Sequence, residues 1–181
     1  TSIASAQGLE VEFSPFGDPE GKVLAELAQA RATVDVAQYN IRSQRIFDAL
    51  SAARARGVRV RIVVDAKNAA KPWNTLDDAF EAAGFDILRY TNTGSRYAIM
   101  HHKFCVIDRA VVMTGSFNWS STAQIVNDEN MLVVRDAALA AAYEVEFDEL
   151  RGAPETTGPA VGAAATVYFS PEDRTRTVVL D

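Results

Sequence analysis

Two short segments of the chain carry side chains that can act together on a phosphate ester. The first holds His101 and Lys103, and the second holds Ser116 and Asn118. On a strand alternate side chains share a face, so His101 and Lys103 are expected to point the same way and His102 to the opposite side. A neutral imidazole can attack phosphorus, while a neighbouring ammonium binds the phosphate and disfavours protonation of that imidazole. We therefore take His101 as the candidate nucleophile and Lys103 as a phosphate ligand.

The second segment supplies hydrogen-bond donors for the same phosphate. Gly115 permits close backbone approach, and the Ser116 hydroxyl and Asn118 amide can donate to phosphoryl oxygens as charge redistributes in the transition state. Further along, Asp128 and Glu129 place carboxylates at the entrance to the next predicted strand. One of them can hold the other imidazole nitrogen of the nucleophile and fix its tautomer, and spacing alone does not choose between them.

These residues match a known signature. The pattern H-x-K-x-x-x-x-D-x-x-x-x-x-x-G-S-x-N resembles that of the phospholipase D superfamily, and this chain matches its fixed positions without a gap at His101, Lys103, Asp108, Gly115, Ser116 and Asn118. The surrounding sequence is most similar to the compact bacterial endonucleases of that superfamily, in which the aligned Glu holds the nucleophilic His. By this resemblance Glu129 orients His101. The likeness covers residues from about 9 to 150, although only the signature is highly specific.

The resemblance also implies a mechanism and a partner. One His forms a covalent phosphohistidine, and a second His, from another copy of the motif, protonates the leaving oxygen and then activates water. The resemblance implies no metal and no cofactor. A homodimer or a further C-terminal domain absent from the given sequence would supply the second half.

Three functions are compatible with these residues. The leading hypothesis is a nuclease that acts on DNA or RNA. A phospholipase D or phosphatidyltransferase would use the same catalytic atoms on a phospholipid, and a catalytically silent module would keep the phosphate pocket only to bind nucleic acid or protein. The net charge of −6 gives no overall attraction for phosphate polymers, so nucleic-acid binding would need a local basic patch. The candidate cations, interleaved with aromatic residues, are Arg42, Arg45, Lys67, Lys71 and Arg96.

The pattern of apolar residues predicts an α/β fold, in which a mixed β-sheet is flanked by helices on both faces of one phospholipase D-type domain. Helices are expected over residues 19–28, 43–56, 76–83, 119–125 and 136–150, and strands over 33–39, 58–65, 86–90, 100–107, 110–114 and 130–135. The strands predicted at 100–107 and 110–114 are joined too tightly at Asp108-Arg109 for anything except an antiparallel hairpin. Asp is favoured in such turns for local hydrogen bonding, so we expect Asp108, like Gly115, to be structural. Cys105 lies in an apolar run and is expected to be a buried free thiol.

The sequence divides into four parts: a tail at residues 1–8, the catalytic domain with one signature at 9–150, a linker at 151–166 and a C-terminal segment at 167–181. Val167-Tyr168-Phe169-Ser170-Pro171 echoes residues 11–15, which favours the start of a second repeat. Ala4-Ser5-Ala6 resembles the cleavage site of a secretory signal without the preceding apolar region. A secreted or periplasmic location is therefore the expectation, with the cytoplasm as the alternative.

Overall fold

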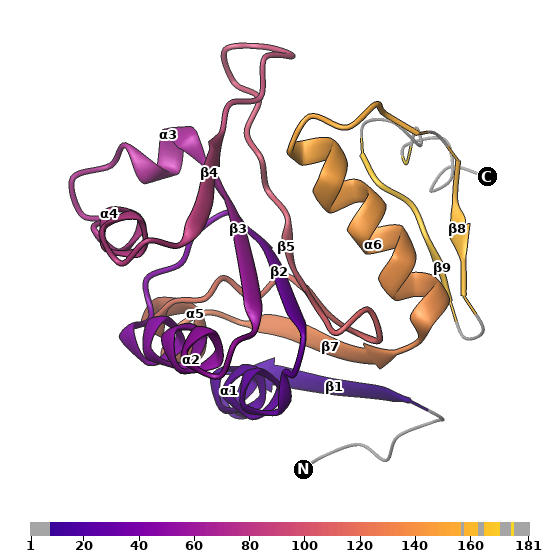
Figure 1. Ribbon diagram of the computed structural model, residues 1–181, viewed down its shortest axis with the longest axis horizontal. Coiled ribbons are helices and arrows are strands. Elements are labelled where there is room, and N and C mark those ends of the chain that lie inside the picture. Colours follow the sequence, from indigo (N-terminus) through magenta and orange to yellow (C-terminus); the bar gives the residue numbers. More distant parts are fainter. Residues whose placement is uncertain (1–7, 157, 163–164, 171–174, 176–181) are drawn as a thin grey trace.

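The computed structural model describes residues 8–156, 158–162, 165–170 and 175, and its centre is a seven-stranded mixed sheet of order β1-β7-β6-β5-β2-β3-β4 (Figure 1). β2, β3 and β4 are parallel, and every other neighbouring pair is antiparallel. The strands are β1 (Leu9–Ser14), β2 (Thr33–Gln38), β3 (Arg59–Asp65), β4 (Asp86–Tyr90), β5 (Lys103–Ile107), β6 (Val111–Gly115) and β7 (Glu129–Arg135). The predicted mixed sheet and its β5–β6 hairpin are confirmed.

Helices cover both faces of this sheet, as predicted (Figure 1). One face carries α1 (Pro19–Gln29), α2 (Gln44–Ala55), α3 (Ala66–Ala69), α4 (Leu76–Ala82) and α5 (Ser121–Ile125), and the other carries α6 (Ala137–Leu150). The central strands are apolar on both sides because each face is covered. In β5, Cys105 packs under the five-helix face and Phe104 under α6. Cys105 is a buried free thiol, and burial raises its pKa.

Local sequence signals fix where the helices begin. The Ser43 side chain accepts a hydrogen bond from the backbone N–H of Ile46, and the Asp136 side chain accepts from the backbone N–H groups of the first turn of α6. Four elements were not expected: the edge strand β1, the short helix α3, and the two strands β8 (Ala160–Val161) and β9 (Thr166–Val167). In addition, residues 100–102 were predicted to belong to a strand but lie outside it, since β5 begins at Lys103.

Residues 151–166 were expected to form a linker, but their described part contains paired strands that pack on the domain. β8 pairs with β9 in an antiparallel hairpin, and both strands pack along α6. Figure 1 shows this returning segment beside α6, on the side away from the sheet. The N-terminal residues 1–7, with the cleavage-like triplet, and most of the segment that would continue the repeat lie outside the described residues. Within the part of the chain that the structure describes, no helix has the length and apolarity needed to cross a bilayer.

Candidate active site

The candidate residues gather at one edge of the sheet. β2, β3 and β6 end at this edge, whereas β5 and β7 begin there, because the neighbours of β5 and β7 run antiparallel to them. An open pocket of about 490 Å³ lies at this edge. It is lined by His101, Lys103, Gly115, Ser116, Asn118, Glu129 and Asn130. The structure thus brings together all five residues predicted to be catalytic, and Asn130 is an addition.

His101 is placed by contacts on both sides of it in the chain. The backbone N–H of Met100 donates to Asp65 Oδ2 (2.9 Å), and the backbone N–H of Tyr39 donates to the His102 carbonyl (2.8 Å). The Tyr39 ring lies against the His101 ring, with centroids 4.8 Å apart in an edge arrangement. Burial and then the charge of Lys103 lower the pKa of His101 below its usual 6.5. The imidazole is therefore neutral over more of the pH range, as a nucleophile requires.

Lys103 is nine-tenths buried, and its ammonium has one hydrogen bond in the described structure, to the His101 carbonyl (2.9 Å). The ammonium also lies 5.3 Å from the centroid of the Tyr39 ring. Burial lowers the pKa of Lys103 to about 8, and the charge of Glu129 opposes this shift. An ammonium nitrogen can donate three hydrogen bonds, so this group has donors to offer to a bound anion.

The turn after β6 is built for close approach to β7. Gly115 has φ +144°, and a Cβ there would lie 2.4 Å from the Asn130 carbonyl oxygen, so any other residue would clash. The backbone N–H of Ser116 donates to that carbonyl, and the backbone N–H of Asn130 donates back to Ser116 Oγ, each at 3.0 Å. Ser116 Oγ is thereby fixed as an acceptor and keeps its own proton for a ligand.

Asn118 lines the same pocket, and its Oδ1 is buried without a hydrogen-bond partner in the described part of the chain. A buried polar atom without a partner is uncommon in a folded protein. This oxygen can only accept a hydrogen bond, so the amide nitrogen of Asn118 is the group that can donate to a phosphoryl oxygen.

Glu129 faces the pocket but does not make the hydrogen bond that the resemblance implies. Its Oε1 accepts from Asn127 Nδ2 (3.0 Å), and no hydrogen bond to His101 is present among the described residues. The carboxylate acts on the site through its charge, which raises the pKa of both His101 and Lys103. Asp128, the alternative, is exposed and does not line the pocket.

Asp108 lies away from the pocket and joins two turns. Its carboxylate accepts hydrogen bonds from the backbone N–H groups of Arg31, Ala32 and Thr33 at 2.9, 2.7 and 2.9 Å. Burial raises the pKa of Asp108, but these three donors outweigh burial and lower it overall. A structural role fits these contacts, although the bonds reach the α1–β2 turn and are not the local ones expected in a hairpin.

His102 packs on the opposite side from the pocket's lysine, as the strand alternation predicts. Its Nε2 lies 2.8 Å from Glu146 Oε1 on α6, and its ring makes edge contacts with Phe104 and Phe169, at centroid distances of 5.4 and 6.2 Å. His102 is therefore held by α6 and the returning segment. Phe117 and Trp119 are buried in the core.

None of the five candidate cations lines the phosphate pocket. Arg45 pairs with Glu20 at 2.6 Å, which occupies its charge, and Arg42 is exposed. Lys67 Nζ donates to the carbonyls of Arg96 and Ala98, at 2.9 and 2.5 Å, and so anchors the loop between β4 and β5.

The other two cations stack on exposed aromatic rings. Lys71 Nζ lies 5.9 Å from the Trp73 ring centroid, and the Arg96 guanidinium lies 4.5 Å from that of Tyr97. Trp73 and Tyr97 are 59% and 73% exposed. Both pairs stand on loops that follow β3 and β4, at the same edge of the sheet as the pocket.

Comparison with known proteins identifies the family. The family described as "Cardiolipin synthase, PLD-like domain" matches residues 23–151 of this chain. The chain belongs to the phospholipase D superfamily. A mitochondrial cardiolipin hydrolase of Chlamydomonas reinhardtii is 34% identical over 139 residues, which is 77% of this chain and 60% of that protein. A phospholipase D of Rickettsia bellii is 34% identical over 134 residues, which is 71% of this chain and 63% of that protein.

The fold agrees with the same assignment. The crystal structure of the phospholipase D family member NUC from Salmonella typhimurium superposes with a TM-score of 0.72 and 27% identity, over 79% of this chain and 93% of that one. This chain therefore spans about 60% of the length of these two curated relatives but nearly all of NUC. The His-Lys signature of this superfamily, which the sequence placed on one strand face, lines a single pocket.

Proposed function

We propose that this chain is a metal-independent nuclease that hydrolyses phosphodiester bonds of DNA or RNA through a phosphohistidine on His101. The observation that carries the proposal is the composition of the phosphate pocket, whose lining is entirely polar residues and one glycine. A phospholipid would bring acyl chains close to its scissile phosphate, so a pocket for it needs apolar side chains beside the phosphate. A nucleic-acid backbone is polar on both sides of the phosphate and needs none.

The proposed reaction has two displacements at phosphorus. In the first, an imidazole nitrogen of His101 forms a bond to phosphorus and the bond to the leaving oxygen breaks, with a proton delivered from a second His. In the second, water gives a proton to that second His while its oxygen bonds to phosphorus, and the N–P bond breaks. Lys103, Ser116 and Asn118 hold the non-bridging oxygens as their charge grows.

The second His must come from another signature-bearing half. The chain contains two histidines, and His102 is held by Glu146 on the far side from the pocket. In-line displacement needs the acid opposite the nucleophile, which a second copy of His101 across a twofold axis would provide. A homodimer or a second half in a longer chain would satisfy this requirement.

An apolar surface beside the pocket supports such a partner. Phe13, Phe16, Ile125 and Val126 are 54%, 99%, 68% and 67% exposed. The strand end and turn that carry the two phenylalanines are tied to the end of α5 by a hydrogen bond from Ser14 Oγ to the Asn127 carbonyl. Ser14 is the register partner of Glu129, so the end of β1 lies beside a residue of the pocket. Exposed apolar patches of this kind mark interaction sites.

Mixing subunits tests the homodimer. Titrating His101→Asn protein into wild type, after subunit exchange, should depress activity more steeply than simple dilution, because mixed dimers lack one of the two imidazoles. Strictly proportional loss, or full activity from a demonstrated monomer, would show that one chain holds a whole active site.

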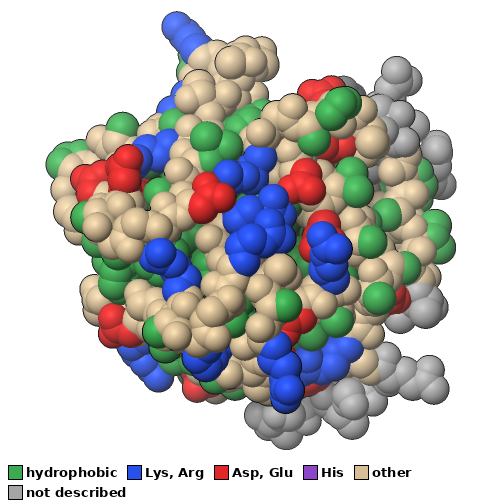
Figure 2. Space-filling model, in the orientation of Figure 1, with side chains coloured by type: hydrophobic (Ala, Val, Ile, Leu, Met, Phe, Trp, Pro, Cys, Tyr) green, Lys and Arg blue, Asp and Glu red, His purple; other side chains and the backbone are tan. Residues whose placement is uncertain are grey.

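The exposed cation–aromatic pairs also favour a nucleic-acid strand. Aromatic rings stack bases and adjacent cations hold phosphates, and Lys71 with Trp73 and Arg96 with Tyr97 supply both on loops at the site's edge. On the described part of the face in Figure 2, basic and acidic side chains are interspersed. Binding would thus be local to the site rather than driven by a broad basic surface.

The alternative is a lipid phosphodiesterase, and the names of the relatives favour it. The Chlamydomonas protein is a cardiolipin hydrolase and the Rickettsia protein a phospholipase D. One assay separates the two functions: single-stranded DNA, duplex DNA, RNA, phosphatidylcholine, cardiolipin and bis(p-nitrophenyl) phosphate are each incubated with the protein in chelator. Cleavage of a nucleic acid without the lipids supports the proposal. Hydrolysis of a lipid without any nucleic acid would overturn it.

A further inference from the structure

His101 borders a second cavity that the phosphate chemistry does not use. This cavity of about 480 Å³ meets the phosphate pocket at His101. One wall is the segment from Tyr90 to Met100, which forms the loop that projects beyond the sheet in Figure 1, and the other is the C-terminal half of α6. We call it the side groove. It is lined by Tyr90, Asn92, Gly94, Ala98, Ile99, Met100, His101, His102, Glu146, Leu150 and Ser170.

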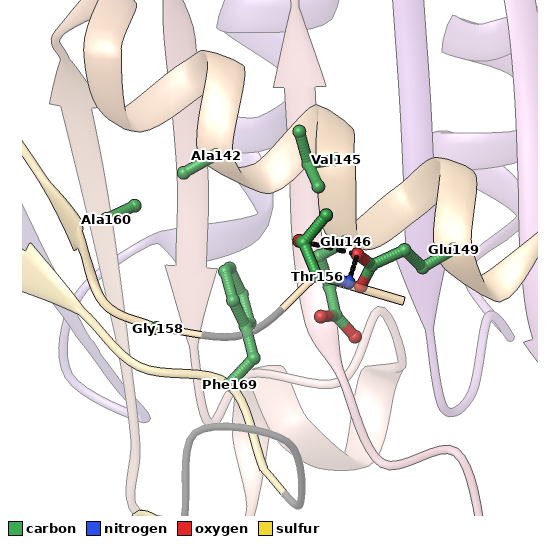
Figure 3. Close-up of a pocket in the computed structure, with 8 residues that line it drawn as sticks. All are labelled: Ala142, Val145, Glu146, Glu149, Thr156, Gly158, Ala160 and Phe169. Atoms are coloured by element: carbon green, nitrogen blue, oxygen red, sulfur yellow. Dashed lines mark hydrogen bonds between the residues drawn. The ribbon is translucent and has the colours of Figure 1, made fainter. Parts of the chain in front are cut away.

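The side groove combines apolar walls with a buried carboxylate. Tyr90, Ile99 and Leu150 supply flat or aliphatic surface, whereas Glu146 is only 6% exposed and lines the cavity. Glu146 Oε1 pairs with His102, and a carboxylate accepts at two oxygens, so Glu146 has further capacity for a donor from a ligand. Figure 3 shows Glu146 on the part of α6 that the returning segment covers, near Phe169.

The opposite wall presents a donor. Asn92 Oδ1 accepts from the backbone N–H of Gly94 (2.9 Å), which fixes the amide and directs its Nδ2 group to other partners. The side groove therefore has an acceptor on α6 and a donor on the projecting loop, with apolar surface between them. Planar heterocycles with polar edges fit such a lining.

We propose that the side groove binds the nucleobase next to the scissile phosphate, and that Glu146 accepts a hydrogen bond from its exocyclic amine. This inference rests on the proposed nuclease function and adds a base preference to it. Carboxylates accept from the amino group of cytosine, and thymine has no such group. A diacylglyceryl group in the same place would bury the carboxylate against acyl chains, which is unfavourable. The buried carboxylate of the side groove thus supports a nucleoside beside the nucleophile. In a homodimer the twofold axis gives each flanking base an equivalent groove.

Matched substrates and variants test this assignment. The values of kcat/KM are measured for single-stranded oligo(dC), oligo(dT) and bis(p-nitrophenyl) phosphate, with wild type, Glu146→Gln and Glu144→Gln. Glu144 is the control because it lies on the same helix, carries the same charge and pairs with Arg109 outside the groove. Wild type should prefer oligo(dC) over oligo(dT) by about tenfold, which is typical of one good contact to a base edge. Glu146→Gln should remove most of this preference, and Glu144→Gln should keep it.

A second variant guards against misfolding of Glu146→Gln. Ile99→Ala trims the apolar wall without touching the His102 pair, so it should lower kcat/KM for both oligonucleotides and keep their ratio. Equal rates on oligo(dC) and oligo(dT) in wild type would overturn the proposal. So would an equal loss on all three substrates in Glu146→Gln, because Glu146 would then act through His102 on the catalytic strand. Hydrolysis of bis(p-nitrophenyl) phosphate without cleavage of either oligonucleotide would instead refute the nuclease function, and the base groove with it.

Discussion

The titration of Lys103 gives a sharp test of the phosphate pocket. Burial lowers its pKa from 10.5 to about 8. This difference corresponds to about 3 kcal/mol by which the empty pocket disfavours the charged ammonium. A bound phosphodiester anion restores that charge, so its binding above pH 8 takes up one proton. The Kd for the anion should then be constant below about pH 8 and rise roughly tenfold for each pH unit above it.

The measurement uses the His101→Asn protein, which removes turnover and the titration of the nucleophile. Binding of bis(p-nitrophenyl) phosphate, which stays a monoanion throughout, is followed by calorimetry from neutral to alkaline pH. Lys103→Arg is the control, because a guanidinium stays charged over this range and its Kd should not vary with pH. A Kd that stays flat well above pH 8 with Lys103 present would refute the reasoning, since the ammonium would then not be the group that binds the anion.

Four further predictions address the mechanism and the fold. His101→Asn should abolish hydrolysis while bis(p-nitrophenyl) phosphate still binds, and wild type quenched during turnover should carry an acid-labile phosphoryl group on His101; wild-type rates in the variant would exclude this nucleophile. Glu129→Gln should be milder, with kcat lowered about 10- to 100-fold, because it removes a charge that acts on His101 and Lys103 but leaves the nucleophile in place, and a loss equal to that of His101→Asn would argue against this role. Activity should survive excess chelator, and loss in chelator that one divalent metal restores would contradict a metal-independent mechanism. The hydrolysis rate should fall on both sides of a pH optimum, with the acidic limb below pH 6.5 because the pKa of His101 is lowered. Burial raises the pKa of Asp77 from 3.8 to about 6, so the free energy of unfolding falls as pH rises between these values. Asp77→Asn should therefore raise the Tm at neutral pH, by removing up to about 3 kcal/mol of this penalty, and change it little near pH 4. An unchanged Tm at both pH values would refute this assignment.

The fold was largely predictable because its signals are local. Continuous apolar runs mark strands that are covered on both faces, and capping residues such as Ser43 and Asp136 mark where helices begin. One missed element is the edge strand β1, in which Leu9, Val11 and Phe13 alternate with acidic residues as in a strand, and which pairs with the distant β7. The other three missed elements are short. α3 spans four residues, and β8 and β9 span two each, in a stretch of Gly, Pro and Ala whose pairing depends on packing against α6. Tertiary contacts of this kind leave no pattern in a single sequence.

The site was predictable only as far as the signature reaches. The five candidate residues share one pocket because β5, β6 and β7 are neighbours that reverse direction at this edge. Asp65, which fixes the backbone before His101, comes from the end of β3, and its contact with Met100 spans 35 residues. Tyr39 lies against the nucleophile from the end of β2. Nothing in the composition of those strands marks them as partners of the catalytic segment.

The basic residues show the limit of arguments from composition. Arg45 and Lys67 were candidates because they lie near strand ends, but the structure gives Arg45 an acidic partner and Lys67 two carbonyl partners. A sequence cannot show such pairing when the partner lies many residues away. Lys71 and Arg96 differ because each stacks on an exposed ring, so their charges stay at the surface near the site.

The position of His102 connects the geometry of the strand to the need for a second half. Adjacent side chains on an extended backbone face opposite sides, so a single His-His-Lys segment can offer only one imidazole to the phosphate. The other is used by the fold: His102 joins the catalytic strand to Glu146 of α6 and lies against Phe169 of the returning segment. The same pair faces the side groove. A chain built this way can bind and attack a phosphodiester with one half and still depend on another half for the proton that releases the leaving group.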